Sequence, residues 1–157
     1  MKLKHIMLLA SLLLIIVALI IAIVVISSNE VEFTPPPFDS SAKDGFPVTD
    51  NQSFTSLSDE RLEFEVHICG KLKVDGGRAT VFFTNPESNS SNLKLRVLNE
   101  SGDLMCETGL IAPGQYIESI PLDISNIPGG RVMLKIMAYE KDTYHSKGSC
   151  TLRGYIE

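Results

Sequence analysis

An apolar run from Ile6 to Ile26 constrains this chain more than any other feature of its 157 residues. The run contains no charge, no proline and no glycine, and Ser11 is its one polar residue. A helix rises about 1.5 Å per residue, so this run spans about 32 Å and matches the roughly 30 Å hydrocarbon core of a bilayer. The sequence therefore predicts a signal-anchor transmembrane helix over residues 1–27 that contacts the lipid bilayer through residues 6–26.

The charges on either side of the run predict its orientation. Lys2 and Lys4 precede it, whereas Glu30 and Glu32 are the first charged residues after it. The positive-inside rule then predicts that the N-terminus is cytoplasmic, that the chain crosses the cell membrane once, and that the domain after the helix is extracytoplasmic. A cleaved signal peptide is the alternative, but its apolar segment is usually about 7 to 15 residues long and ends in a small-residue cleavage site. We therefore expect the anchor to be retained.

Residues 28–60 have the composition of a flexible tether. Pro35-Pro36-Pro37 favours an extended polyproline conformation, and clusters of Ser, Asp, Asn, Gly and Thr follow without apolar periodicity. About 33 flexible residues have a root-mean-square reach near 30 Å. The segment is expected to hold an extracytoplasmic domain, residues 61–157, away from the bilayer.

Short runs of alternating hydrophobicity, separated by Gly, Pro, Asn and Asp, predict seven strands in this domain. They lie near residues 62–74, 78–84, 93–97, 104–108, 115–122, 131–140 and 148–156. Gly70 interrupts the first run as a bulge, Asp75-Gly76-Gly77 makes a tight hairpin turn, and the very apolar 131–140 run is expected at the centre of its sheet. The predicted fold is all-β, a seven-stranded immunoglobulin/fibronectin-III-like sandwich; a jelly-roll fragment or a small barrel is the alternative.

The same alternation predicts the core. The inward residues are expected to be Phe64, Val66, Ile68, Ala79, Val81, Phe83, Leu93, Leu95, Val97, Val132, Leu134, Ile136, Ala138, Leu152 and Ile156.

Three cysteines cannot all pair within one chain. A disulfide is permitted outside the cytoplasm, and the first and last strands are often neighbours in such sandwiches, so Cys69 and Cys150 are the candidate bridge and Cys106 stays free. Cys69 is out of phase with the inward residues of its strand, so three buried thiols remain the alternative.

Charge and motif searches exclude several function classes. After residue 27 the chain has 12 basic and 19 acidic residues, a formal charge of −7, which disfavours nucleic acid and anionic lipid surfaces as partners. The sequence contains no nucleophile elbow, zinc-protease motif, phosphate-binding glycine loop or calcium loop. His67 and His145 are expected to be exposed and not to act as general bases. We therefore predict no enzyme, no cofactor and no metal site.

The polar clusters at Asn85 and at residues 99–103 are interpreted as turns rather than cation sites. Sequons, relevant only in a eukaryotic secretory pathway, occur at Asn51, Asn89 and Asn99.

Three segments, 84–89, 107–114 and 137–144 with the following Gly148-Ser149, resemble motifs of small, mostly uncharacterised single-pass cell-envelope proteins of Gram-positive bacteria. Those proteins have an N-terminal helix, a Pro-rich tether and one immunoglobulin-like domain. The resemblance implies a bacterial cell surface and no defined activity. A weaker likeness is to plant membrane-anchored proteins with a late-embryogenesis-type sandwich.

The combined features predict a membrane-anchored binding or scaffolding module, an accessory part of a surface, secretion or conjugation assembly. Its partners would be other envelope proteins, contacted through strand edges and loops. One alternative is a small enzyme or ligand-binding protein with a site on the 85–92 and 141–148 loops. Another is a membrane stator or spacer that acts through its helix, although this helix lacks Gly-xxx-Gly packing.

Overall fold

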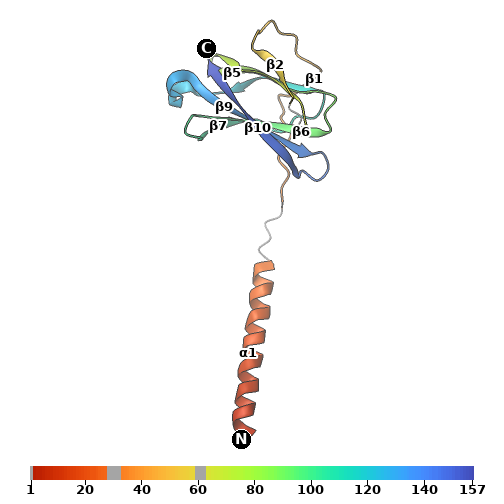
Figure 1. Cartoon of the computed structure of the whole chain (residues 1–157), viewed down its shortest axis with the longest axis vertical. Helices are drawn as coiled ribbons and strands as arrows, with labels where there is room; N and C mark the ends of the chain where they lie inside the picture. Colours follow the sequence, from red (N-terminus) through yellow and green to blue (C-terminus); the bar gives the residue numbers. More distant parts are fainter. Residues whose placement is uncertain (1, 28–32, 59–62) are drawn as a thin grey trace. The chain divides into compact units, whose positions relative to one another are not determined.

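The computed structural model describes residues 2–27, 33–58 and 63–157. The chain divides into two units, residues 1–34 and residues 35–157 (Figure 1). Helix α1 (Lys2–Ser27) belongs to the first unit, and neither proline nor glycine interrupts it. Among the residues that the structure describes, no helix is both long and apolar enough to cross a membrane. The transmembrane role expected for residues 6–26 stays a prediction.

The described residues of the second unit form ten strands and two short 3₁₀ helices. These elements are β1 (Lys43–Asp44), β2 (Phe54–Leu57), β3 (Val66–Cys69), β4 (Lys71–Asp75), β5 (Arg78–Asn85), β6 (Ser91–Leu98), β7 (Leu104–Glu107), β8 (Gln115–Pro121), η1 (Ile124–Asn126), η2 (Pro128–Gly130), β9 (Arg131–Glu140) and β10 (Ser146–Ile156).

The strands form one mixed sheet in the order β1-β8-β5-β4-β10-β9-β6-β7, with β3 also beside β5 and β2 beside β3. Among the strand pairs of the described residues, β4 and β10 are parallel and the others are antiparallel. The sheet curls so that its two halves face one core (Figure 1). The prediction of a predominantly β domain is confirmed, and the prediction that 131–140 is central is confirmed because β9 lies between β10 and β6.

The predicted number of strands is wrong because the first predicted run is two strands. Gly70 separates β3 from β4, and its backbone bonds to two other segments. Its N–H donates to the Ser53 carbonyl (3.1 Å), and its carbonyl accepts from the Tyr155 N–H (2.9 Å). After this break the chain stays beside β5, but its second partner changes: β3 pairs with β2, whereas β4 pairs with β10. Leu62, where the first run was expected to begin, lies outside the described residues.

The other two additional strands come from the expected tether. β1 pairs with β8, and β2 pairs with β3 over four residues. Before them, Asp39 N–H donates to the Leu110 carbonyl (2.8 Å), and Leu110 N–H donates to the Pro37 carbonyl (2.9 Å). A flexible tether is therefore the wrong description of residues 35–57; residues 28–32, 59 and 60 lie outside the described residues. The segment shows no apolar periodicity because β1 and β2 are short and keep much of their surface in solvent.

The predicted core agrees closely with the structure. Of its inward residues, thirteen are at most 5% exposed, and Leu152 and Ile156 are partly buried against them. The Asp75-Gly76-Gly77 turn also forms as expected, with positive φ at both glycines, 55° and 75°.

Candidate functional site

Four aromatic side chains meet on the surface of the β unit, on the face of β3 and β5 that points away from the core. We call Phe46, Phe54, His67 and Phe82 the aromatic patch. The ring of Phe46 lies 5.0 Å from His67 and 5.7 Å from Phe54, and Phe54 lies 6.2 Å from Phe82, as centroid distances. Phe46 is 55% exposed, whereas the His67 side chain is 21% exposed.

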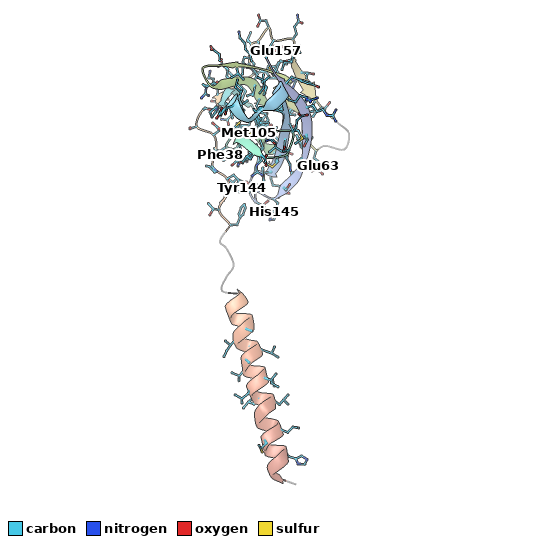
Figure 2. All side chains as sticks on the ribbon, turned by 90° about the vertical axis from the view of Figure 1, so that its left-hand side faces the viewer. Phe38, Glu63, Met105, Tyr144, His145 and Glu157 are labelled. Carbon is cyan, nitrogen blue, oxygen red and sulfur yellow. The ribbon has the colours of Figure 1, made fainter. Side chains whose placement is uncertain are left out.

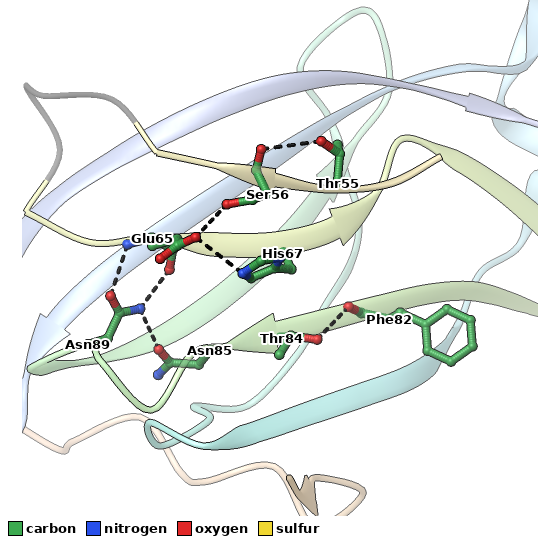
Figure 3. Close-up of polar contacts among 8 residues, drawn as sticks. All are labelled: Thr55, Ser56, Glu65, His67, Phe82, Thr84, Asn85 and Asn89. Atoms are coloured by element: carbon green, nitrogen blue, oxygen red, sulfur yellow. Dashed lines mark hydrogen bonds and ion pairs between the residues drawn. The ribbon is translucent and has the colours of Figure 1, made fainter. Parts of the chain in front are cut away.

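Strand alternation and a bulge produce the patch. In β3, Val66 and Ile68 are completely buried, so His67 between them points to the opposite face. In β5 the register with β8 shifts between Thr80 and Phe83, and Phe82 has a φ of 43°. A bulky residue at positive φ is an outlier that typically costs about 1–3 kcal/mol. The Thr84 hydroxyl donates to the Phe82 carbonyl (2.9 Å, Figure 3), which supports the bulge.

A carboxylate lies beside the patch. The Ser56 hydroxyl donates to Glu65 Oε1 at 2.5 Å, and His67 Nε2 lies 3.3 Å from the same oxygen (Figure 3). A nucleophilic serine instead needs the imidazole as its hydrogen-bond acceptor, with the carboxylate behind the imidazole. Here the carboxylate is between the hydroxyl and the imidazole, so this order orients the histidine without activating the serine.

A buried pair of asparagines fixes the loop next to this carboxylate. Asn89 accepts the Glu65 N–H (2.9 Å) and donates to the Glu65 carbonyl (2.6 Å) and to Asn85 Oδ1 (2.7 Å, Figure 3). Asn85 is completely buried and donates to the carbonyls of Ser91 (2.9 Å) and Ile111 (3.0 Å). The amide of the Asn89 sequon is thus already used inside the fold, and the cluster at Asn85 is structural, as the turn interpretation expected.

Two open hollows flank the aromatic patch. One, of about 450 Å³, is lined by Phe46 together with Gly45, residues 84–87, Pro113 and Gly114. The other, of about 490 Å³, is lined by Phe82 together with residues 48–51, Lys73 and Thr80. Val48 beside it is fully exposed. The aromatic patch is therefore part of a wider, uneven surface that includes both hollows.

The predicted disulfide is absent, because Cys69, Cys106 and Cys150 are all free thiols. Cys69 lies in β3 opposite Phe54, whereas Cys150 lies in β10 opposite Ile136, and these two strands do not pair. Burial raises the pKa of each thiol, that of Cys106 to about 11 with a contribution from the neighbouring Glu107 charge.

The two histidines differ in their surroundings. The expectation of an exposed His67 is wrong, since it is enclosed by the aromatic patch. His145 is exposed in the β9–β10 hairpin, next to Tyr144 (Figure 2). The signal that sequence reasoning missed was Phe82, an aromatic residue at a polar-face position of its strand.

The two loops of the alternative ligand site do approach each other. Lys147 Nζ lies 3.4 Å from Ser90 Oγ and 3.3 Å from the Glu63 carboxylate. The 99–103 turn is closed by Asn99 and Asp103, whose side chains and backbone exchange hydrogen bonds of 2.9 Å. Among the residues that the structure describes, no group of three or more His, Cys, Asp or Glu residues is arranged to hold a metal ion.

A comparison of the chain with protein families, with curated proteins and with solved structures finds no match.

Proposed function

We propose that this chain is a membrane-anchored extracytoplasmic binding module whose partner docks on the aromatic patch. One observation carries the proposal: rings occupy the outer face of the sheet, where Phe46 is 55% exposed and Val48 next to it is fully exposed. Aromatic residues are enriched at protein interfaces, and neighbouring exposed apolar side chains commonly mark a docking site.

The backbone of Phe82 supports the same proposal. Its φ of 43° holds the ring in the patch at an energetic cost, although a regular strand would avoid that cost. Strained residues that the surrounding structure maintains tend to occur where a protein binds or reacts. The carboxylate of Glu65 orients His67 under the exposed Phe46 ring, which gives a preformed surface. Preformed surfaces lose less entropy on binding.

The support for the membrane anchor comes from the amino-acid sequence. The run from Ile6 to Ile26 has the length and composition of a spanning segment, and Lys2 and Lys4 favour a cytoplasmic N-terminus. A module placed this way meets proteins of the cell envelope. We infer a role as an accessory component of a surface, secretion or conjugation assembly.

We also infer that the curled sheet is an immunoglobulin-like sandwich. One half consists of β2, β3, β5, β8 and β1, and the other of β10, β9, β6 and β7, with β4 paired to both halves. Side chains from both halves share one hydrophobic core, as in sandwiches of this kind.

Site-specific photocrosslinking in the native host tests the docking surface. A photoreactive residue replaces Val48, which is fully exposed and therefore tolerates replacement. We expect a discrete crosslinked partner that is lost when Phe46→Ala is added. The matched control places the probe at Ile124, which is 48% exposed and lies in η1. Equal crosslinking from both positions, or crosslinking at position 48 that survives Phe46→Ala, would refute a role of the patch.

A further inference from the structure

The outer face of the other half of the sheet gathers five cations. Residues of β9 and β6 that alternate with the buried core positions point to this face, as do those of β10. We call this surface the basic face; its cations are Lys94, Arg96, Arg131, Lys135 and Arg153. The face belongs to a chain with a net formal charge of −5, so its charge opposes that of the rest of the molecule.

The strand register brings these cations close together. Arg96 is directly opposite Lys135 across the β6–β9 pair. Arg153 is opposite Met133, which places it diagonal to both Arg131 and Lys135. Directly opposite residues have Cβ atoms about 4.5–5.5 Å apart and diagonal ones about 7–8 Å apart, and like charges at such positions destabilise a sheet. The fold therefore maintains a cluster of positive charge that works against its own stability.

The carboxylates near this face do not neutralise it. Glu107 pairs with Lys94 (2.9 Å) and Arg96 (2.8 Å), and Glu100 pairs with Arg131 (3.0 Å). Five cations against two acids leave an excess of three positive charges. Within the described ranges, no ion pair involves Lys135 or Arg153. These two side chains are the unpaired charges that a partner would meet.

Apolar side chains share the face with the cations. Met133 and Leu98 are opposite each other between the cations, and Leu104 continues the row across β7 at 51% exposure. Arg131, Arg153 and Met133 line a hollow of about 390 Å³ together with Tyr155, which is 50% exposed. Arginine, methionine and tyrosine are the residues enriched in protein–protein interfaces.

We propose that the basic face binds an acidic segment of a protein partner, in which carboxylates alternate with apolar side chains. The carboxylates would pair with Lys135 and Arg153, and the apolar side chains would cover Met133 and Tyr155. A polyphosphate has no group for the apolar row. The part of the chain after the helix has 12 basic and 19 acidic residues, so an anionic membrane surface would repel it. Charge and apolar surface together therefore favour a protein.

The basic face and the aromatic patch are separate surfaces, because they lie on different halves of the sheet. Loss of one surface leaves the other intact. A module with both would contact two partners at once.

Fluorescence anisotropy with the full-length chain in a mild detergent tests the proposal. The probe is a labelled 12-residue peptide of alternating Glu and Leu. Three competitors identify the chemistry: a peptide of alternating Glu and Ser, inorganic polyphosphate, and phosphatidylglycerol vesicles. We expect salt-sensitive binding of the Glu-Leu peptide, with each competitor displacing it less well than unlabelled Glu-Leu peptide.

The charge-removal variant is Lys135→Gln with Arg153→Gln, for which we expect roughly tenfold weaker peptide binding. Lys43→Gln with Lys141→Gln is the matched control, because both lysines are exposed outside the two candidate surfaces and the net charge changes equally. Thermal melts of both variants confirm folding, and removal of like charges should not lower the first variant's Tm. The proposal is overturned if the wild-type chain does not bind the peptide, if both variants lose affinity equally, or if polyphosphate or vesicles displace the peptide better than unlabelled peptide.

Discussion

Replacement of Asn85 by alanine should be among the most damaging single changes in the β unit. The completely buried side chain donates to the carbonyls of Ser91 and Ile111 and accepts from Asn89. A net contribution of about 1 kcal/mol per hydrogen bond gives about 3 kcal/mol. Ile111's carbonyl keeps a second donor, the Leu93 N–H at 3.0 Å, which moderates the loss at that group. We therefore expect the free energy of unfolding to fall by about 2–4 kcal/mol.

Urea unfolding of residues 35–157, followed by far-ultraviolet circular dichroism, measures this change, because these residues form a unit with its own core. The matched control is Asn99→Ala. The Asn99 side chain makes two hydrogen bonds, both to Asp103, but they are exposed to solvent. Exposed groups exchange their partner for water, so we expect a loss under about 1 kcal/mol. An Asn85→Ala variant no less stable than Asn99→Ala would refute the argument that burial sets the value of this network.

Three further predictions concern β7 and the segment after it. Hydrogen bonds from its two cationic partners lower the pKa of Glu107 despite partial burial. This stabilisation is present above the ordinary pKa of 4.5 and is lost as pH falls through the folded-state pKa, so Tm should fall more steeply below pH 4.5 than in Glu107→Gln. Because the pKa of Cys106 is about 11, its alkylation by iodoacetamide at pH 8 should be slower than that of a free cysteine by roughly a hundredfold; equal rates would contradict its burial. Gly109→Ala would place a Cβ atom 2.6 Å from the Asp39 amide nitrogen, so limited proteolysis should cut near residue 39 faster than in the wild type; unchanged cleavage would show that the segment can shift without loss.

The alternation of apolar and polar residues was sufficient to predict strand bounds and inward residues where a strand is long and has one buried face. The 131–140 run matches β9 at both ends, because Val132, Leu134, Ile136 and Ala138 alternate cleanly with outer-face residues. The same logic located the inward residues of β5 and β6.

The edge pairings of residues 35–57 escaped prediction because they depend on backbone hydrogen bonds. The bonds that join Pro37 and Asp39 to Leu110 involve only main-chain atoms, and any polar sequence has such atoms. The disulfide prediction failed for a related reason. It assumed that the first and last strands are neighbours, but the break at Gly70 sends β4, and not the Cys69 strand, to β10.

The two candidate surfaces depend on which residues the strand register places side by side, and the amino-acid composition does not predict that register. The aromatic patch joins Phe46, Phe54, His67 and Phe82 from four separate segments. The basic face emerges in the same way, when β6, β9 and β10 align cations that are far apart in the sequence. The net charge alone indicated an acidic domain and gave no indication of the basic face.

The position of β10 has a consequence for how the protein is made. This last strand lies in the interior of the sheet, between β4 and β9, and even Glu157 exchanges hydrogen bonds with Leu72 and Val74. Synthesis at about 5–20 residues per second takes roughly 8–30 s for a chain of this length. From the synthesis of β4 until that of β10, the edge of β4 that pairs with β10 is vacant, and unpaired strand edges invite wrong partners. The sheet is therefore complete only once β10 has been synthesised, and a stop codon that removed β10 would leave a gap in the middle of the sheet.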